Sequence, residues 1–362
     1  MRILQVINSL GTGGAEKLLL DAIPKYIETG VSMELLLLDG RDHPFLAALK
    51  KSQCKIHVLS KGSVYNPLHI FKIIPFLKQF DLVHVHLFPA LYWVALSKFI
   101  SFSKTPLVFT EHNTSNRRRG WLFKAIDRFM YGRYSRIVTI TSEVGTLLKK
   151  QIGDKKERFK LIHNGVALDT IEKAVAANFL DFSISEEEKI LIQVSSFTEQ
   201  KDQETLIKSL LLIEQPCQLL LVGTGPRLEL CKQQVKALHL EQRVQFLGTR
   251  MDVPQLLKMA DVVVLSSHYE GLSLSSIEGL ASGSPFVASR VPGLTEVVEG
   301  AGVLFSVGDE KSLAAAINSL FESTTYYNEV TTLCLKRAGR YNIDKMIQEH
   351  LALYTQLCKN QN

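Results

Sequence analysis

The stretch that decides the fold of this chain covers residues 262–279 and reads VVVLSSHYEGLSLSSIEG. It begins with an apolar run, Val262–Leu265, of the kind found in strands that are buried on both faces of a parallel sheet. A loop rich in glycine and serine follows, and residues 274–281 then have the composition of a helix. We therefore predict a strand–loop–helix unit, with Glu270 in the loop and Glu278 about one turn into the helix.

Units of this kind recur along the chain. Short apolar runs alternate with segments of helical period over about 300 residues, which favours a doubly wound α/β architecture. The turn signal Asn164-Gly165 and the charged residues 185–188 place a boundary between two such domains. We predict an N-terminal domain over residues 1–168, a C-terminal domain over 182–341, and a last helix over 342–358 that packs back on the first domain.

The composition excludes several classes of protein. The 362 residues are 46% hydrophobic and 22% charged, which is ordinary for a globular chain. Five scattered cysteines without a CxxC pattern disfavour a disulfide scaffold and a structural zinc site. Residues 1–7 read as a buried strand rather than a signal peptide, and the longest apolar stretch is interrupted by Pro89 and Lys98. We therefore expect a cytoplasmic protein.

The charge is divided unevenly along the chain. Residues 1–180 carry 26 basic and 14 acidic side chains, whereas residues 181–362 carry 16 and 22. The densest basic stretch begins at Arg117-Arg118-Arg119 and continues to Arg136. Its functional interpretation is contact with anionic lipid headgroups or an acceptor phosphate, and the alternative is a solvated face. The acidic second half and the absence of interleaved aromatic stacking motifs disfavour a nucleic-acid partner.

Two loops have the composition of anion-binding loops. Gly11-Thr12-Gly13-Gly14 follows the strand Ile3–Ile7 and opens a helix, where backbone amides favour an anion; a tight turn without a ligand is the alternative. The pattern is not GxGxxG, which disfavours a nicotinamide or flavin site. In the stretch 262–279, the amides of residues 271–273 suit a diphosphate and the two glutamates suit sugar hydroxyls. The alternative there is a capped helix with two solvated carboxylates.

These motifs together resemble the retaining glycosyltransferases of family 4. The E-x7-E element is followed by a G-L-A-S-G-S-P stretch (279–285) and a P-G-L-T-E-V-V stretch (292–298), as in that family. The resemblance also covers segments elsewhere in the chain: Gly13-Gly14-Ala15-Glu16, Thr110-Glu111-His112-Asn113, His163-Asn164-Gly165-Val166 and Gly223-Thr224-Gly225-Pro226. It implies the GT-B fold, in which two Rossmann-like doubly wound domains face each other across a cleft.

The resemblance also implies roles for individual residues. Glu278 would bind the nucleotide ribose, His112 would lie at the donor sugar, and Lys201 would stabilise the departing diphosphate. Glu270 and the amides of residues 271–273 would hold the sugar and the diphosphate. The donor-side residues are then Glu278, Gly271, Leu272, Ser273, Lys201, Ser196, Gly223 and Arg250. The acceptor-side residues are Gly13, Gly14, His86, Asn113 and Arg117; for His86, a core or loop histidine is the alternative.

Besides His163, which stands where the family has a proline, one departure from the family pattern matters for the site. The family has an arginine five residues before the lysine, and Ser196 occupies that place here. We therefore expect a weaker charge clamp on the diphosphate, or one completed from elsewhere, with Arg250 as a substitute. The chain contains no DxD motif, so we expect no metal and no cofactor besides the donor substrate itself.

The expected reaction is transfer of a sugar from a nucleotide-diphosphate-sugar, with UDP-sugars first, to a lipid-linked or glycan acceptor. Surface polysaccharides such as capsule or lipopolysaccharide would be the products, made at the inner face of the cell membrane. A nucleotide-sugar 2-epimerase on the same fold and an inactive sugar-nucleotide-binding relative remain as alternatives.

Overall fold

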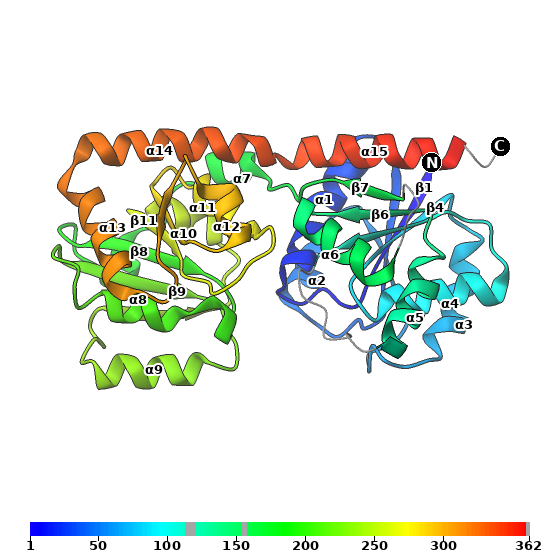
Figure 1. The fold of residues 1–362 in the computed structure, drawn as a ribbon, viewed down its shortest axis with the longest axis horizontal. Helices are drawn as coiled ribbons and strands as arrows, with labels where there is room; N and C mark the ends of the chain where they lie inside the picture. The colour runs from blue at the N-terminus through cyan, green and yellow to red at the C-terminus, as the bar shows by residue number, and fades with distance from the viewer. Residues whose placement is uncertain (113–120, 154–157, 360–362) are drawn as a thin grey trace. The chain divides into compact units, whose positions relative to one another are not determined.

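The computed structural model describes residues 1–112, 121–153 and 158–359, which form two compact units (Figure 1). Unit 1 comprises Met1–Gly165 together with Ile343–Asn362, and unit 2 comprises Val166–Asn342. Each unit contains one sheet whose paired strands all run parallel and are flanked by helices. The predicted doubly wound α/β class is therefore confirmed.

The sheet of unit 1 has the strand order β3-β2-β1-β4-β5-β6-β7. Its strands are β1 (Arg2–Ile7), β2 (Ser32–Leu37), β3 (Lys55–Val58), β4 (Leu82–His86), β5 (Leu107–Glu111), β6 (Arg136–Thr139) and β7 (Phe159–Leu161). The helices of the same unit are α1 (Gly14–Glu28), α2 (Pro44–Leu49), α3 (His69–Leu77), α4 (Ala90–Ser101), α5 (Trp121–Tyr131), α6 (Ser142–Ile152) and α15 (Ile343–Lys359). The chain order reverses between the neighbouring strands β1 and β4, which makes their boundary the switch point of this sheet.

The two faces of this sheet bury different chemistry. On one face, Leu4, Val85 and Phe109 join residues of α3, α4 and α5 in a single apolar core. Side chains alternate across a strand, so Gln5, His84 and His86 belong to the other face. Helix α15, the red helix in Figure 1, packs against β4 and α1. Its Tyr354 hydroxyl lies 2.6 Å from His84 Nδ1 on that polar face.

The sheet of unit 2 has the strand order β10-β9-β8-β11-β12-β13. Its strands are β8 (Lys189–Val194), β9 (Cys217–Val222), β10 (Val244–Gly248), β11 (Val262–Leu265), β12 (Phe286–Ser289) and β13 (Val303–Phe305). The helices are α7 (Leu168–Glu172), α8 (Gln203–Ser209), α9 (Leu228–Ala237), α10 (Val253–Met259), α11 (Leu274–Leu280), α12 (Pro292–Val298), α13 (Glu310–Glu322) and α14 (Thr324–Ala338). Single 3-10 turns are η1 (Phe179–Phe182), η2 (Glu199–Lys201) and η3 (Gly339–Tyr341).

The switch point of unit 2 lies between β8 and β11. Ligands of open α/β sheets bind outside the carboxyl ends of the strands at such a point. The loops that leave β8 and β11 there are residues 195–198 and 266–273. The second of these is the loop of the stretch 262–279, which folds as the predicted strand, loop and helix.

Two predicted acceptor-side residues, Asn113 and Arg117, lie outside the described residues, as do Arg118 and Arg119. Within the described parts of the chain, we find no helix with both the length and the apolar character needed to cross a membrane.

Candidate functional site

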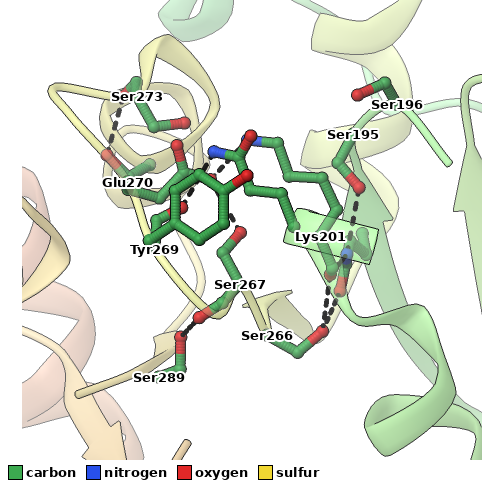
Figure 2. Close-up of polar contacts among 12 residues, drawn as sticks. Ser195, Ser196, Lys201, Ser266, Ser267, Tyr269, Glu270, Ser273 and Ser289 are labelled. Carbon is green, nitrogen blue, oxygen red and sulfur yellow. Dashed lines mark hydrogen bonds and ion pairs between the residues drawn. The ribbon is translucent and has the colours of Figure 1, made fainter. Parts of the chain in front are cut away.

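A buried ion pair marks the switch point of unit 2. Lys201, at the end of η2, contacts the Glu270 carboxylate through its Nζ atom (Figure 2). The two side chains are 15% and 6% exposed, respectively. Ser267 donates a second hydrogen bond to the same carboxylate oxygen, at 2.7 Å. Two residues that are 69 positions apart in the sequence, and that were both predicted for the donor site, therefore meet.

A layer of uncharged side chains holds the two loops together beneath this pair. The Ser266 hydroxyl lies 2.8 Å from the Asp202 carbonyl and 2.9 Å from Gln193 Oε1. The Gln193 amide in turn donates to the Lys201 carbonyl, at 3.0 Å. The backbone that carries Lys201 is thus tied to the end of β11, as Figure 2 shows. These contacts fix the lysine without adding a charge.

The glycine motifs of the sequence act as close-packing points for the same loops. A Cβ atom on Gly223 would lie 2.1 Å from the Ser195 carbonyl oxygen, and one on Gly225 would lie 2.3 Å from the Phe197 carbonyl oxygen. A Cβ atom on Gly293 would lie 2.3 Å from the carbonyl oxygens of Glu270 and Gly271. The G-T-G-P turn therefore supports the loop before Lys201, and the P-G-L-T-E segment supports the loop that carries Glu270.

The remaining predicted donor-side residues surround this centre. Gly271, Leu272 and Ser273 lead directly into α11, and Glu278 lies partly buried on that helix. Ser196 is exposed, and its carbonyl accepts a hydrogen bond of 3.0 Å from Gln203. The serine supplies no charge at this position.

Arg250, the predicted substitute for the missing arginine, pairs with a neighbouring carboxylate. Its Nε atom donates to Asp252 at 2.8 Å, and its guanidinium lies 5.9 Å from the centre of the Phe182 ring. Its second guanidinium contact goes to the same carboxylate, through Nη2. In the free protein, the charge of Arg250 is therefore paired with the carboxylate of Asp252.

Asp202 is a site feature that the sequence reasoning missed. It has a left-handed backbone (φ 44°) and caps α8, with Oδ1 accepting from the Thr205 amide at 3.3 Å. Its Oδ2 atom is buried without a hydrogen-bond partner in the described residues and lies 3.6 Å from His268 Nε2. Burial raises the pKa of this carboxyl group. An aspartate placed directly before a helix is a cap signal, which could have drawn attention to it.

Unit 1 presents its candidate residues at the corresponding switch point. Gly13 and Gly14 are exposed at the start of α1, after the end of β1. Asn8, in the same loop, donates to the Phe88 carbonyl at 2.8 Å and accepts from the Ala90 amide at 3.2 Å. The loops that follow β1 and β4 are thereby tied together, and the glycines lie at their rim.

His112 is held from within the unit by a buried row of polar side chains. Its Nε2 atom lies 3.0 Å from His86 Nδ1, and His86 Nε2 lies 2.8 Å from Gln5 Oε1. His86 is 3% exposed and Gln5 is 1% exposed, whereas His112 is partly exposed. Burial holds the pKa of His86 well below its usual range and lowers the pKa of His112 to about 4. All three groups are therefore neutral near pH 7.

The structure thus answers the question that the sequence left open for His86. Both of its ring nitrogens are engaged, one by His112 and one by Gln5, so His86 is a core histidine that supports His112. Sequence reasoning missed Gln5 and Tyr354, although the alternation Val83-His84-Val85-His86 indicates one polar face of β4. Among the described residues, no group of acidic, histidine or cysteine side chains has the arrangement of a metal site.

Comparison with known proteins identifies the two halves of the chain. The model of "Glycosyltransferase Family 4" matches residues 12–170, and that of "Glycosyl transferases group 1" matches residues 177–332. The chain is 34% identical over 179 residues to N-acetyl-alpha-D-glucosaminyl L-malate synthase of Bacillus anthracis, and the match spans about half of each protein (48% and 47%). It is 26% identical over 300 residues to an uncharacterized glycosyltransferase of Methanocaldococcus jannaschii, covering 76% and 75% of the two chains.

Solved structures show the same fold. The crystal structure of Anabaena HepE in complex with UDP-glucose superposes with a TM-score of 0.86, at 24% identity, over 98% of this chain and 100% of that one. This likeness confirms the predicted GT-B fold. The chain therefore belongs to the glycosyltransferases, with a family 4 domain in its first half and a group 1 domain in its second.

Proposed function

We propose that this glycosyltransferase moves a sugar from a nucleotide-diphosphate-sugar, a UDP-sugar in the first instance, to a hydroxyl acceptor in glycan biosynthesis. The observation that carries the proposal is the Lys201–Glu270 pair at the switch point of unit 2. A buried cation beside a carboxylate is suited to a ligand that combines a diphosphate with sugar hydroxyls. The related fold of HepE, whose structure contains UDP-glucose, supports the same donor class.

In this proposal each donor-side residue has a distinct task. Lys201 turns from Glu270 toward the diphosphate, and a charge-assisted contact with the departing phosphate lowers the barrier of the reaction. Glu270, which Ser267 still holds, accepts hydrogen bonds from the sugar hydroxyls. Glu278 on α11 binds the ribose hydroxyls. The amides of residues 271–273 contact the diphosphate from the same loop.

The proposed transfer proceeds with retention at the anomeric carbon. The bond between that carbon and the diphosphate oxygen breaks, and a bond to the acceptor oxygen forms on the same face of the sugar. The proton of the acceptor hydroxyl passes to the departing phosphate, so no protein side chain has to take it up. His112 of unit 1 contributes at the donor sugar, and we propose that no bound metal takes part.

We further propose that the acceptor is lipid-linked and that unit 1 contacts an anionic membrane surface. Exposed apolar side chains occur on α3 with the residue before it, on α4 with the residue after it, and on α5; α3 contacts α4, and α4 contacts α5. They are Leu68, Phe71, Phe99, Ile100, Phe102, Phe123 and Phe129. Arg133 lies over the rings of Phe99 and Phe129, at 4.9 and 4.3 Å from their centres. Apolar groups that carry basic neighbours are typical of interfacial membrane contact.

The experiment that tests the proposal follows the fate of a labelled donor. The purified chain is incubated with UDP-glucose or UDP-N-acetylglucosamine, with a bacterial lipid extract or with L-malate as acceptor. We expect label to appear in a lipid product with the anomeric configuration of the donor, as read by proton NMR. Transfer to malate alone would move the acceptor class to a small hydroxy acid. Conversion of the donor without any acceptor would favour the epimerase.

A further inference from the structure

The polar face of the sheet in unit 1 determines the hydrogen-bonding state of His112. A neutral imidazole ring carries one N–H donor and one acceptor nitrogen. His86 is neutral because it is buried in a low-dielectric environment next to other imidazole groups, which hold its pKa well below the usual range. Its two nitrogens must therefore play opposite roles, and identifying one of them fixes the other.

Gln5 identifies the first nitrogen. Its Oε1 atom, which can only accept, lies 2.8 Å from His86 Nε2, so this nitrogen carries the proton. The orientation of the Gln5 amide is supported at its other end, where Nε2 lies 3.5 Å from the Tyr354 hydroxyl and 3.7 Å from Met33 Sδ. A thioether sulfur accepts but does not donate, so the reversed amide would place an acceptor against it.

The donor and acceptor roles of the contact between His86 and His112 follow from the protonation of His86 Nε2. Since His86 Nε2 donates to Gln5, His86 Nδ1 is an acceptor. The group 3.0 Å from it, His112 Nε2, must then be the donor. His112 is itself neutral, with its pKa lowered by burial to about 4, so its second nitrogen, Nδ1, carries a lone pair. His112 is partly exposed, whereas the two residues behind it are buried.

The geometry points to Gln5 as a positioning residue that, through His86, holds His112 in the Nε2–H tautomer and leaves Nδ1 as a hydrogen-bond acceptor. Resting on the proposed function, this means that His112 accepts a hydrogen bond from a substrate hydroxyl and does not donate one. A sugar or acceptor hydroxyl fits such a site, whereas a carbonyl or an anionic oxygen at the same point has no donor to offer. Gln5 touches no substrate in this scheme and acts only by fixing the tautomer.

The test is the tautomer of His112, read by two-dimensional NMR on the full chain labelled with 15N-histidine. The signals of His112 are identified by their loss in His112→Gln. At pH 7.5 we expect pyrrole-type Nε2 and pyridine-type Nδ1 in the wild-type protein. In Gln5→Met, which replaces the strong amide acceptor by a weakly accepting thioether at similar volume, both tautomers should be populated. A wild-type His112 protonated on Nδ1, or an unchanged tautomer in Gln5→Met, would overturn the inference.

Tyr354→Phe is the matched control. It removes another buried polar group that contacts Gln5, but leaves the contact between Gln5 Oε1 and His86 in place. We expect this variant to keep the Nε2–H tautomer, so a general loosening of the core is distinguished from loss of the relay. If Gln5→Met does not fold, the tautomer of His112 in the wild-type spectrum still tests the inference.

Turnover provides the second readout. In Gln5→Met we expect kcat to fall roughly tenfold with an unchanged donor KM, as for one hydrogen bond lost in the reacting complex. Equal losses in Tyr354→Phe would assign Gln5 a structural role only. Because the NMR result does not depend on activity, a chain without transferase activity that shows the predicted tautomer refutes the proposed function and leaves the relay intact.

Discussion

At the switch point of unit 2, a lysine and a glutamate meet as a buried ion pair, whereas at the switch point of unit 1 the partly exposed His112 is backed by a buried neutral imidazole and a buried amide. The strand order is equivalent at the two places, because the chain order reverses beside the first strand of each unit. Each site also contains a non-glycine residue with a left-handed backbone, Leu87 in unit 1 and Asp202 in unit 2. Strained backbone of this kind clusters at functional sites.

The difference shows how one topology is adapted to two tasks. A diphosphate carries negative charge, and a pre-placed cation that is neutralised by a carboxylate in the free protein can pass to it, while Ser267 and the sugar hydroxyls hydrogen-bond the carboxylate that the cation leaves. A hydroxyl group carries no net charge, and a neutral acceptor nitrogen with a fixed tautomer is sufficient to orient it. The comparison predicts that charge changes dominate in unit 2 and that tautomer and protonation changes dominate in unit 1.

The largest effect is expected from removing the cation. Lys201→Met should lower kcat roughly a hundredfold to a thousandfold, by analogy with the loss of a preorganised charge-stabilising group. It should also lower the free energy of unfolding by about 3–5 kcal/mol, because Glu270 is left buried without its ion pair. Initial rates and urea denaturation measure the two effects.

The double variant Lys201→Met/Glu270→Gln separates the two consequences. It carries no unpaired charge, so we expect most of the stability to return while the activity stays low. Recovery of activity together with stability would show that the ion pair serves the fold rather than the reaction.

The next effect in size compares the two glutamates. Glu278→Ala should weaken nucleotide binding by about 1.5–3 kcal/mol, or roughly 10- to 150-fold, through loss of charge-assisted hydrogen bonds to ribose. Glu270→Gln should lower turnover more than nucleotide affinity, because its proposed contact is with the sugar. Calorimetry measures the loss of nucleotide affinity in each variant, and steady-state kinetics measures the loss of turnover. Equal losses of affinity and turnover in both variants would contradict the division of roles.

Acid should affect unit 1 before unit 2. Burial lowers the pKa of His112 to about 4 and the pKa of His350 to about 3, so between pH 6.5 and 4 the unfolded chain binds protons that the native unit does not. Stability contributed by these groups is therefore present above pH 6.5 and is lost as the pH falls through this window. For each group, the stability that is lost amounts to about 1.4 kcal/mol for every unit by which its pKa in the native state lies below its pKa in the unfolded state. The raised pKa of Asp202 in unit 2 acts in the opposite direction.

Hydrogen exchange followed by mass spectrometry resolves the two units in the full chain. After correction for intrinsic exchange rates, we expect β4 and β5 to lose protection between pH 7 and pH 5, while β8 and β11 keep theirs. Equal losses in both sheets would argue against a neutral histidine row as the acid-sensitive element.

The smallest effect concerns the exposed apolar side chains of unit 1. Phe71→Ser combined with Phe102→Ser should weaken binding to anionic liposomes roughly tenfold, since these rings are 60% and 87% exposed and would be partly buried in the interface. Leu180→Ser, which removes an exposed side chain of unit 2, is the matched control. Sedimentation with vesicles measures both, and a wild-type protein that does not bind vesicles would remove the membrane proposal.

The sequence was sufficient to predict most of the fold, including the loop and the helix that carry Glu270 and Glu278. Continuous apolar runs such as Val262–Leu265 predict buried parallel strands, and the spacing of Glu270 and Glu278 predicts a loop followed by a helix, as found. These predictions rest on local pattern. The contact between Lys201 and Glu270 joins two segments far apart in the chain, and only the family resemblance placed both at the donor.

The neutral polar groups of unit 1 are brought together by tertiary packing, which no local sequence pattern predicts. Gln5, His86 and Tyr354 come from β1, β4 and α15, and their roles follow from strand order and from the position of a helix near the end of the chain. Gln5 lies within an apolar strand, and no spacing to other polar residues in the sequence marks it as part of a site. The orphaned Oδ2 of Asp202 likewise follows from burial, which the sequence does not specify.

The most direct test of the account is calorimetric titration of the full chain with UDP, GDP, ADP and CMP, repeated with Lys201→Met and Glu278→Ala. We predict micromolar binding of one nucleoside diphosphate, with UDP first, and a loss of at least roughly tenfold in each variant. Binding of that nucleotide with unchanged affinity in both variants would contradict the claim that the switch point of unit 2 holds the donor.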